Sequence, residues 1–169
     1  SAASDVYKRQ VYNKTVIIKS VFYNRKFRKQ NRGKLMNIAL MAHDRKKELM
    51  VQFCIAYCGI LAEHSVCATN TTGKLVSEAT GLPVTLYLHA DQGGAQQIGA
   101  RISYNEIDLV LFFCDPSNPG GFDDINKIER LCDQYQIPFA TNAATAEVLV
   151  QGLRRGDLDW RNIVNPKRR

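Results

Sequence analysis

A short run rich in hydroxyl groups, residues 68–73 with the sequence ATNTTG, holds the residues best suited to chemistry. An apolar stretch precedes this run and helix-forming residues follow it, so we expect its threonines where a strand ends and a helix begins. Backbone N–H groups at a helix N-terminus, with threonine hydroxyls beside them, form a set of donors that suits a phosphate. A plain helix cap is the alternative interpretation, because threonine is also favoured for capping alone.

The elements that would position this run follow from the alternation of short apolar stretches and amphipathic stretches after Met36. The spacing predicts strands at residues 37–42, 65–69, 84–88, 107–113 and 138–141. It predicts helices at about 46–61, around 75–79, and at about 95–104, 124–135 and 144–152. Five β-α units in succession predict an α/β fold, a single three-layer α/β/α domain around a five-stranded, mainly parallel, doubly wound sheet.

Ligands of such sheets bind at the carboxyl ends of the strands. The residues expected there are rich in carboxylates, hydroxyls and glycines, and no internal repeat beyond the alternation is visible. They are His43 and Asp44, residues 69–73, residues 89–94, the loop from Asp115 to Asp124, and residues 141–145.

The basic character of the chain is confined to its first residues. The net charge is +7, but residues 1–34 hold ten Lys and Arg against Asp5 alone, and the remainder has a net charge of −2. We therefore expect no nucleic-acid partner for the domain, and no apolar run is long enough to span a membrane. We interpret residues 1–35 as a basic extension, disordered or non-native, with residues 36–169 as the domain. A basic arm that touches RNA or acidic lipid is the alternative for the extension.

The five cysteines predict reduced thiols in a cytoplasmic protein, because they are odd in number and no secretory signal precedes them. Cys54 and Cys58 lie one helical turn apart. No second Cys or His pair completes a zinc set, so we expect both thiols to pack in the core, and we predict no metal site.

Five motifs in order, MNIALMAHD, ATNTTGKLVSEATGLPV, GGAQQIGA, IDLVLFFCDP and IPFATNAATAEVLVQGLRRGDLDW, make the chain resemble the methylglyoxal synthase family from Met36 to about Trp160. The resemblance implies a cytoplasmic homohexamer that needs no cofactor or metal. It also implies a lyase activity, the conversion of dihydroxyacetone phosphate to methylglyoxal and inorganic phosphate.

The resemblance also implies roles for individual residues. Phosphate-binding residues would be Lys47, Thr69, Asn70, Thr71, Thr72 and Gly73, and residues that contact the substrate would be His43, His89 and Ala90. The active-site carboxylates would be Asp44, Asp115 and Asp124. The residues alone also allow a helix-start cap formed by His43 and Asp44, and a solvated Lys47.

Two departures from the family pattern concern the first chemical step. Ala95 takes the place of the aspartate regarded as the general base, and Phe122 takes the place of a histidine that steers the ketone oxygen. Asp91, His89 or Asp44 would then serve as a substitute base. The alternatives are a catalytically silent subunit that binds phosphate or triose phosphate, and a regulatory module of a larger biosynthetic enzyme.

Overall fold

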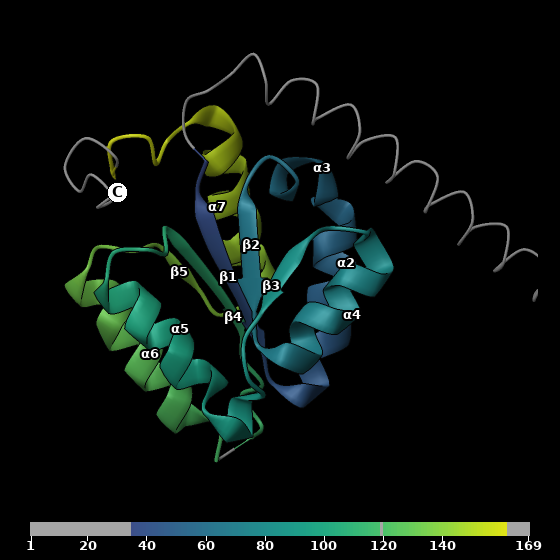
Figure 1. The fold of residues 1–169 in the computed structure, drawn as a ribbon, viewed down its shortest axis with the longest axis vertical. Coiled ribbons are helices and arrows are strands. Elements are labelled where there is room, and N and C mark those ends of the chain that lie inside the picture. The colour runs from purple at the N-terminus through teal and green to yellow at the C-terminus, as the bar shows by residue number, and fades with distance from the viewer. Residues whose placement is uncertain (1–34, 119, 162–169) are drawn as a thin grey trace, which may run out of the picture.

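The computed structural model describes residues 35–118 and 120–161. Five strands form one sheet in the order β3-β2-β1-β4-β5 (Figure 1), with β1 at Asn37–Ala42, β2 at Ser65–Ala68, β3 at Val84–Leu86, β4 at Leu109–Phe113 and β5 at Phe139–Ala140. All four strand pairings are parallel, which confirms the predicted fold class. Apart from Leu35, the predicted extension at residues 1–35 lies outside the described residues.

The helices cover both faces of the sheet and produce two separate hydrophobic cores. One face carries α2 (Lys47–Ala56), α3 (Cys58–Leu61), α4 (Asn70–Thr80) and α7 (Ala143–Arg155); the other carries α5 (Gly94–Ser103) and α6 (Phe122–Gln134) (Figure 1). Alternate residues of β1 point to opposite cores, as the period of two along a strand requires. Ile38 and Leu40 lie in the first core, and Ala39 and Met41 in the second.

Several predicted boundaries are wrong in detail. The helix predicted at about 46–61 is a 3₁₀ turn η1 (Asp44–Lys46) followed by α2 and α3, because the backbone of Tyr57 (φ −106°, ψ 18°) leaves the helical region. The strand predicted at 107–113 begins at Leu109. The Asp108 carboxylate instead accepts the backbone N–H of Asn37 at 2.7 Å, which replaces one bond of the ladder.

The helix after the ATNTTG run begins earlier than predicted. Thr69 is its N-cap and Asn70 its first residue, so Thr71, Thr72 and Gly73 belong to the first turn of α4. The donors of this helix start therefore come from the run itself.

All five cysteines are free thiols, as expected. Cys54 and Cys58 are buried in the first core, which confirms the packing interpretation, and burial raises the pKa of Cys54 to about 12. Across the described ranges, no helix is long and apolar enough to cross a membrane.

Candidate active site at the carboxyl ends of the strands

The sheet order places the predicted site residues along one edge. The chain runs from β1 outward through β2 to β3 and then returns to β4 on the other side of β1. The point where the order reverses lies between β1 and β4, which is where parallel α/β sheets bind ligands. His43 follows β1 and Asp115 lies two residues beyond β4, so the structure brings them to this point.

His43 connects the two sides of that point through its ring. The backbone N–H of Asp115 donates to Nδ1 of His43 at 2.8 Å, and Nε2 of the ring lies 3.1 Å from the carbonyl oxygen of Gly121. A backbone N–H can only donate, so Nδ1 is unprotonated and Nε2 carries the hydrogen that Gly121 accepts. His43 therefore ties the end of β1 to the loop between β4 and α6.

Asp115 is buried and its carboxylate is held by the turn that follows it. Both the backbone N–H and the hydroxyl of Ser117 donate to Oδ1 of Asp115, at 3.0 and 2.7 Å. These hydrogen bonds hold the pKa of Asp115 below its ordinary value. Sequence reasoning named Asp115 but missed Ser117 and Gly121. The order Asp-Pro-Ser-Asn, typical of a side-chain-stabilised turn, was the available signal for Ser117.

The start of α4 keeps its donors free of a side-chain cap. Thr69 has the extended backbone of an N-cap residue, but its side chain makes no capping hydrogen bond to the described residues. Its hydroxyl instead donates to the Thr72 hydroxyl at 3.4 Å, and both threonines are buried. The N–H of Gly73 donates to the carbonyl oxygen of Thr69 at 2.8 Å, whereas those of Thr71 and Thr72 have no partner four residues back. This N-terminus therefore presents the N–H groups of Thr71 and Thr72 to the carboxyl edge.

Two members of the run serve the fold. The N–H of Asn70 donates to the carbonyl oxygen of Leu88 at 3.2 Å, which fastens α4 to the segment after β3. Gly73 packs against β2 and β3: a Cβ there would lie 3.1 Å from Cβ of Ala68 and 3.2 Å from Cγ1 of Val84. The buried Oδ1 of Asn70 has no hydrogen-bond partner in the described part of the chain.

His89 reaches the start of α4 from the loop after β3. Its Nδ1 lies 3.0 Å from the Thr71 hydroxyl oxygen, and both side chains are half-buried. Ala90 and Asp91 belong to the 3₁₀ turn η2 (Ala90–Gln92), where both are exposed. The structure thus brings His89 to the ATNTTG run, and Asp91 lies two residues further along the same loop.

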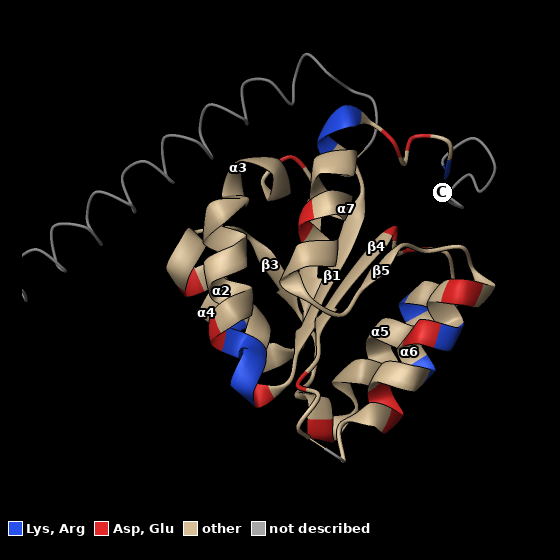
Figure 2. Cartoon of the chain, turned by 180° about the vertical axis from the view of Figure 1, so that it is seen from behind, with Lys and Arg blue, Asp and Glu red and all other residues tan. Residues whose placement is uncertain are grey.

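Lys47 and Asp44 form a pair at the end of β1. Nζ of Lys47 donates to Oδ1 of Asp44 at 2.5 Å; the Asp44 side chain is 94% exposed and the Lys47 side chain 22%. The hydrogen bond and the charge of Lys47 hold the pKa of Asp44 below its ordinary value. Charges around the edge are divided, with Arg45 and Lys46 before α2 and acidic residues in the first turn of α6 (Figure 2).

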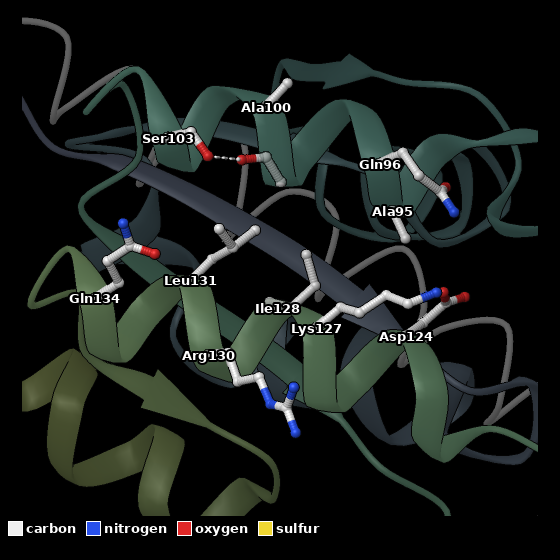
Figure 3. A pocket seen from close by; sticks show the side chains of 11 residues that line it. Ala95, Gln96, Ala100, Ser103, Asp124, Lys127, Ile128, Arg130, Leu131 and Gln134 are labelled. Carbon is white, nitrogen blue, oxygen red and sulfur yellow. Dashed lines mark hydrogen bonds between the residues drawn. The ribbon is translucent and has the colours of Figure 1, made fainter.

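Ala95 faces a groove of about 470 Å³ between α5 and α6. Figure 3 shows Ala95 near one end of this groove, with the side chains of Asp124 and Lys127 beside each other. The structure therefore brings Asp124 to the position of Ala95. Phe122, the first residue of α6, is 38% exposed. Among the described residues, no three His, Cys, Asp or Glu side chains are grouped to hold a metal ion.

The comparisons with known proteins agree with each other. Residues 50–141 match the family model described as the MGS-like domain. The methylglyoxal synthase of Caldicellulosiruptor saccharolyticus is 59% identical over 133 residues, which cover 78% of this chain and 94% of that protein. The methylglyoxal synthase of Lysinibacillus sphaericus is 55% identical over 129 residues, covering 76% and 96% respectively.

A solved structure extends the likeness to three dimensions. The crystal structure of methylglyoxal synthase from Elizabethkingia anophelis superposes with a TM-score of 0.66 at 38% identity, covering 70% of this chain and 78% of that one. The likeness in sequence and the likeness in fold both extend over most of the chain. The chain therefore belongs to the methylglyoxal synthase family.

Proposed function

We propose that this chain is a lyase that eliminates phosphate from dihydroxyacetone phosphate, giving methylglyoxal and inorganic phosphate. The observation that carries the proposal is the start of α4 at the carboxyl edge of the sheet, where the Thr69 side chain does not cap the backbone N–H donors. Relatives of more than half identical sequence are named methylglyoxal synthase, which supports this substrate over other phosphorylated ligands.

Phosphate binding falls to the start of α4 in this proposal. The N–H groups of Thr71 and Thr72 and the Thr71 hydroxyl donate to the phosphate oxygens, and the positive end of the helix favours their charge. Lys47 adds a positive charge when its ammonium group leaves Asp44 and binds the phosphate. Thr69, Asn70, Thr72 and Gly73 set the backbone of the turn. The two threonine hydroxyls bind each other, the backbone N–H of Asn70 binds Leu88, and Gly73 packs against the sheet.

The ketone end of the substrate falls to the point between β1 and β4. There the Nε2–H of His43, which donates to the Gly121 carbonyl oxygen in this structure, can donate to the substrate instead. A donor at this point would stabilise the enediolate oxygen that forms when a proton leaves the neighbouring carbon. Asp44, Asp115 and Asp124 are the carboxylates that the family resemblance assigns to the surrounding site.

The first chemical step is the impaired one in this proposal. Ala95 has no titratable group, and Phe122 cannot donate a hydrogen bond. Losing a positioned base commonly lowers the rate by about 10²- to 10⁴-fold, and the effects of residues that act together are not additive. We therefore expect turnover well below that of a chain with aspartate and histidine at these positions.

A coupled assay with dihydroxyacetone phosphate tests the proposal on the full chain beside Ala95→Asp and Ala95→Asp/Phe122→His. We expect slow turnover by the wild type and about 10²- to 10⁴-fold faster turnover by the restored variants. Equal rates would contradict the impairment. Absence of turnover by the wild type, beside active restored variants, would indicate a silent phosphate-binding subunit. Absence of turnover by all three would overturn the proposed activity.

We also propose that the protein is a cytoplasmic homohexamer, as the family resemblance implies. Sedimentation of the purified chain measures this state. A single species with the mass of one 19.0 kDa chain would contradict it.

A further inference from the structure

The contact between Thr71 and His89 has a consequence for proton transfer that the proposed function does not assign. We propose, resting on that function, that a phosphate bound at the start of α4 fixes His89 in the tautomer with hydrogen on Nδ1. Nε2 of His89 then becomes the base that takes the proton from the substrate carbon.

The inference rests first on how firmly the structure holds His89. Its carbonyl oxygen accepts the N–H groups of Gln92 and Gly94, at 3.0 and 2.9 Å. The preceding residue, Leu88, is held from both sides, since its N–H donates to Oε1 of Gln97 and its carbonyl accepts from Asn70. The imidazole is thus mounted on backbone that is fixed to both α4 and α5.

The Thr71 hydroxyl oxygen carries a single hydrogen, which only one acceptor can take. A threonine hydroxyl has one hydrogen to donate and can accept with its lone pairs. Without ligand, either group can donate across the 3.0 Å contact between Thr71 and His89. A bound phosphate offers oxygen acceptors, so the Thr71 hydrogen turns to the phosphate. The bond to the imidazole survives only if Nδ1 of His89 donates.

Nε2 of His89 is free to act as a base. Within the described part of the chain, Nε2 of His89 has no hydrogen-bond partner, and with hydrogen on Nδ1 it carries a free lone pair. The nearby carboxylates are weaker candidates for the base. The pKa of Asp115 is lowered by the hydrogen bonds from Ser117, and the Asp44 side chain is 94% exposed and so is not held in one position. His43 is already engaged at both ring nitrogens.

Nε2 of His89 takes the proton from the hydroxyl-bearing carbon, and the electron pair of that C–H bond forms the enediolate. The imidazolium returns the proton to the enediolate oxygen, which regenerates the base. The hydroxyl on the carbon that was deprotonated first then loses its own proton, which drives cleavage of the C–O bond to the phosphate group. Phosphate leaves with the electron pair of that bond and takes up the proton. The remaining enol becomes methylglyoxal by moving a proton from oxygen to carbon.

A nuclear magnetic resonance experiment reads the tautomer directly. The chain has three histidines, His43, His64 and His89, so a full chain labelled with ¹³C and ¹⁵N in histidine gives few signals, and a His89→Asn variant assigns one set. Inorganic phosphate is added to saturation, with its binding measured by calorimetry. We expect His89 to shift to protonated Nδ1 and unprotonated Nε2. His64, whose Nδ1 lies 3.4 Å from the N–H of Met36 at the start of β1, is the internal reference and should not shift.

Each other outcome counts against the inference. Phosphate binding with hydrogen on Nε2 of His89, alone or on both nitrogens, overturns the inference and leaves the proposed function standing. A Thr71→Val variant that binds phosphate and still shows the shift also overturns it. No phosphate binding at all overturns the phosphate site and the inference with it.

Kinetics provide the second arm. His89→Gln should lower kcat by about 10²-fold with little change in KM, because the base acts after binding. In the Ala95→Asp background the same change should lower kcat by less than about tenfold, since an aspartate then supplies the base. Equal losses in the two backgrounds would show that His89 has a structural role only.

Discussion

The two sides of the carboxyl edge differ in what their side chains can exchange with a substrate. Beside β2 and β3, the start of α4 presents donors, and Thr71 meets His89 at 3.0 Å. At the starts of α5 and α6, the corresponding positions hold the methyl group of Ala95 and the ring of Phe122, which neither donate nor titrate, although Asp124 lines the same groove as Ala95. The side that binds phosphate therefore also holds His89, the base that we propose, whereas Ala95 and Phe122 on the other side supply no base.

The strongest way to break this division is to move the loop that joins its two sides. A Cβ on Gly94 would lie 2.1 Å from the carbonyl oxygen of Leu88 and 3.0 Å from that of His89, so Gly94→Ala must displace backbone. A displacement of about 1 Å can lower a rate by about 10²-fold. We expect a loss of that size in kcat, measured with alanine retained at position 95, where His89 is the proposed base.

Gly99→Ala is the matched control on the same helix. Its Cβ would meet only the ends of flexible side chains, at 3.2 Å from Leu131 and 3.7 Å from Ile128. This variant should keep the kcat of its parent chain. Thermal melts of both variants show whether a loss of activity comes from unfolding or from a displaced loop in a folded chain. Full activity of a folded Gly94→Ala chain would contradict the positioning of His89 by this loop.

The phosphate side can be tested alone. Thr71→Val removes the hydroxyl donor and keeps nearly the same side-chain shape. A hydrogen bond to a charged group contributes roughly 1.5–3 kcal/mol. We expect the Kd for inorganic phosphate to rise by about tenfold to a hundredfold in calorimetry. Ala95→Asp should leave that Kd unchanged. If Ala95→Asp and Thr71→Val shift it equally, the two sides are not separate.

The fold and the location of the site could be predicted because both follow from periodic patterns. Apolar runs alternating with amphipathic ones specify a parallel sheet, and the carboxyl ends of its strands then follow from topology. The direction of individual side chains could not be predicted. His43 is bound to Gly121, 78 residues further along, and Thr71 to His89, 18 residues further along, and spacing in the sequence contains no information on such contacts.

The boundaries failed where a side chain replaced a backbone partner. β4 begins two residues later than predicted because the carboxylate of Asp108 accepts the N–H of Asn37, a bond between residues 71 positions apart. The sequence predicts the position of the ATNTTG run correctly but begins the helix after it. In the structure, Thr71 and Thr72 lie in the first turn of α4. The single helix at about 46–61 is interrupted by the torsions of Tyr57, and the breaker signal in its sequence, Gly59, lies two residues further along.

The link between the two sides at His43 is open to a smaller test. His43→Gln removes the ring that accepts the Asp115 N–H. A net hydrogen-bond contribution of about 0.5–1.5 kcal/mol predicts roughly threefold to tenfold faster amide hydrogen exchange at Asp115. The Cys114 amide, which donates to the Thr141 carbonyl oxygen at 2.9 Å, is the internal reference. Unchanged exchange at Asp115 would mean that the β4–α6 loop does not depend on His43.

The smallest expected effect concerns the turn after Asp115. The hydroxyl of Ser117 is the main cause of the lowered pKa of Asp115, so in the folded state this carboxyl binds its proton less readily than in the unfolded chain. A depressed folded pKa adds stability above the unfolded value of about 3.9, and that stability is lost as the pH falls through the folded value. Ser117→Ala should therefore lower the urea midpoint at neutral pH, and the difference from wild type should vanish under strongly acidic conditions.

Ser103→Ala is the control for this effect, because the Ser103 hydroxyl donates to the carbonyl oxygen of Gly99, a group that does not titrate. Its difference from wild type should not follow the titration of a carboxyl group. If the Ser117→Ala difference were also independent of pH, Ser117 would stabilise the turn without holding the charge of Asp115. The Asp115 carboxylate would then be free to accept a proton. It would be a second candidate for the role of base, which we assign to His89 alone.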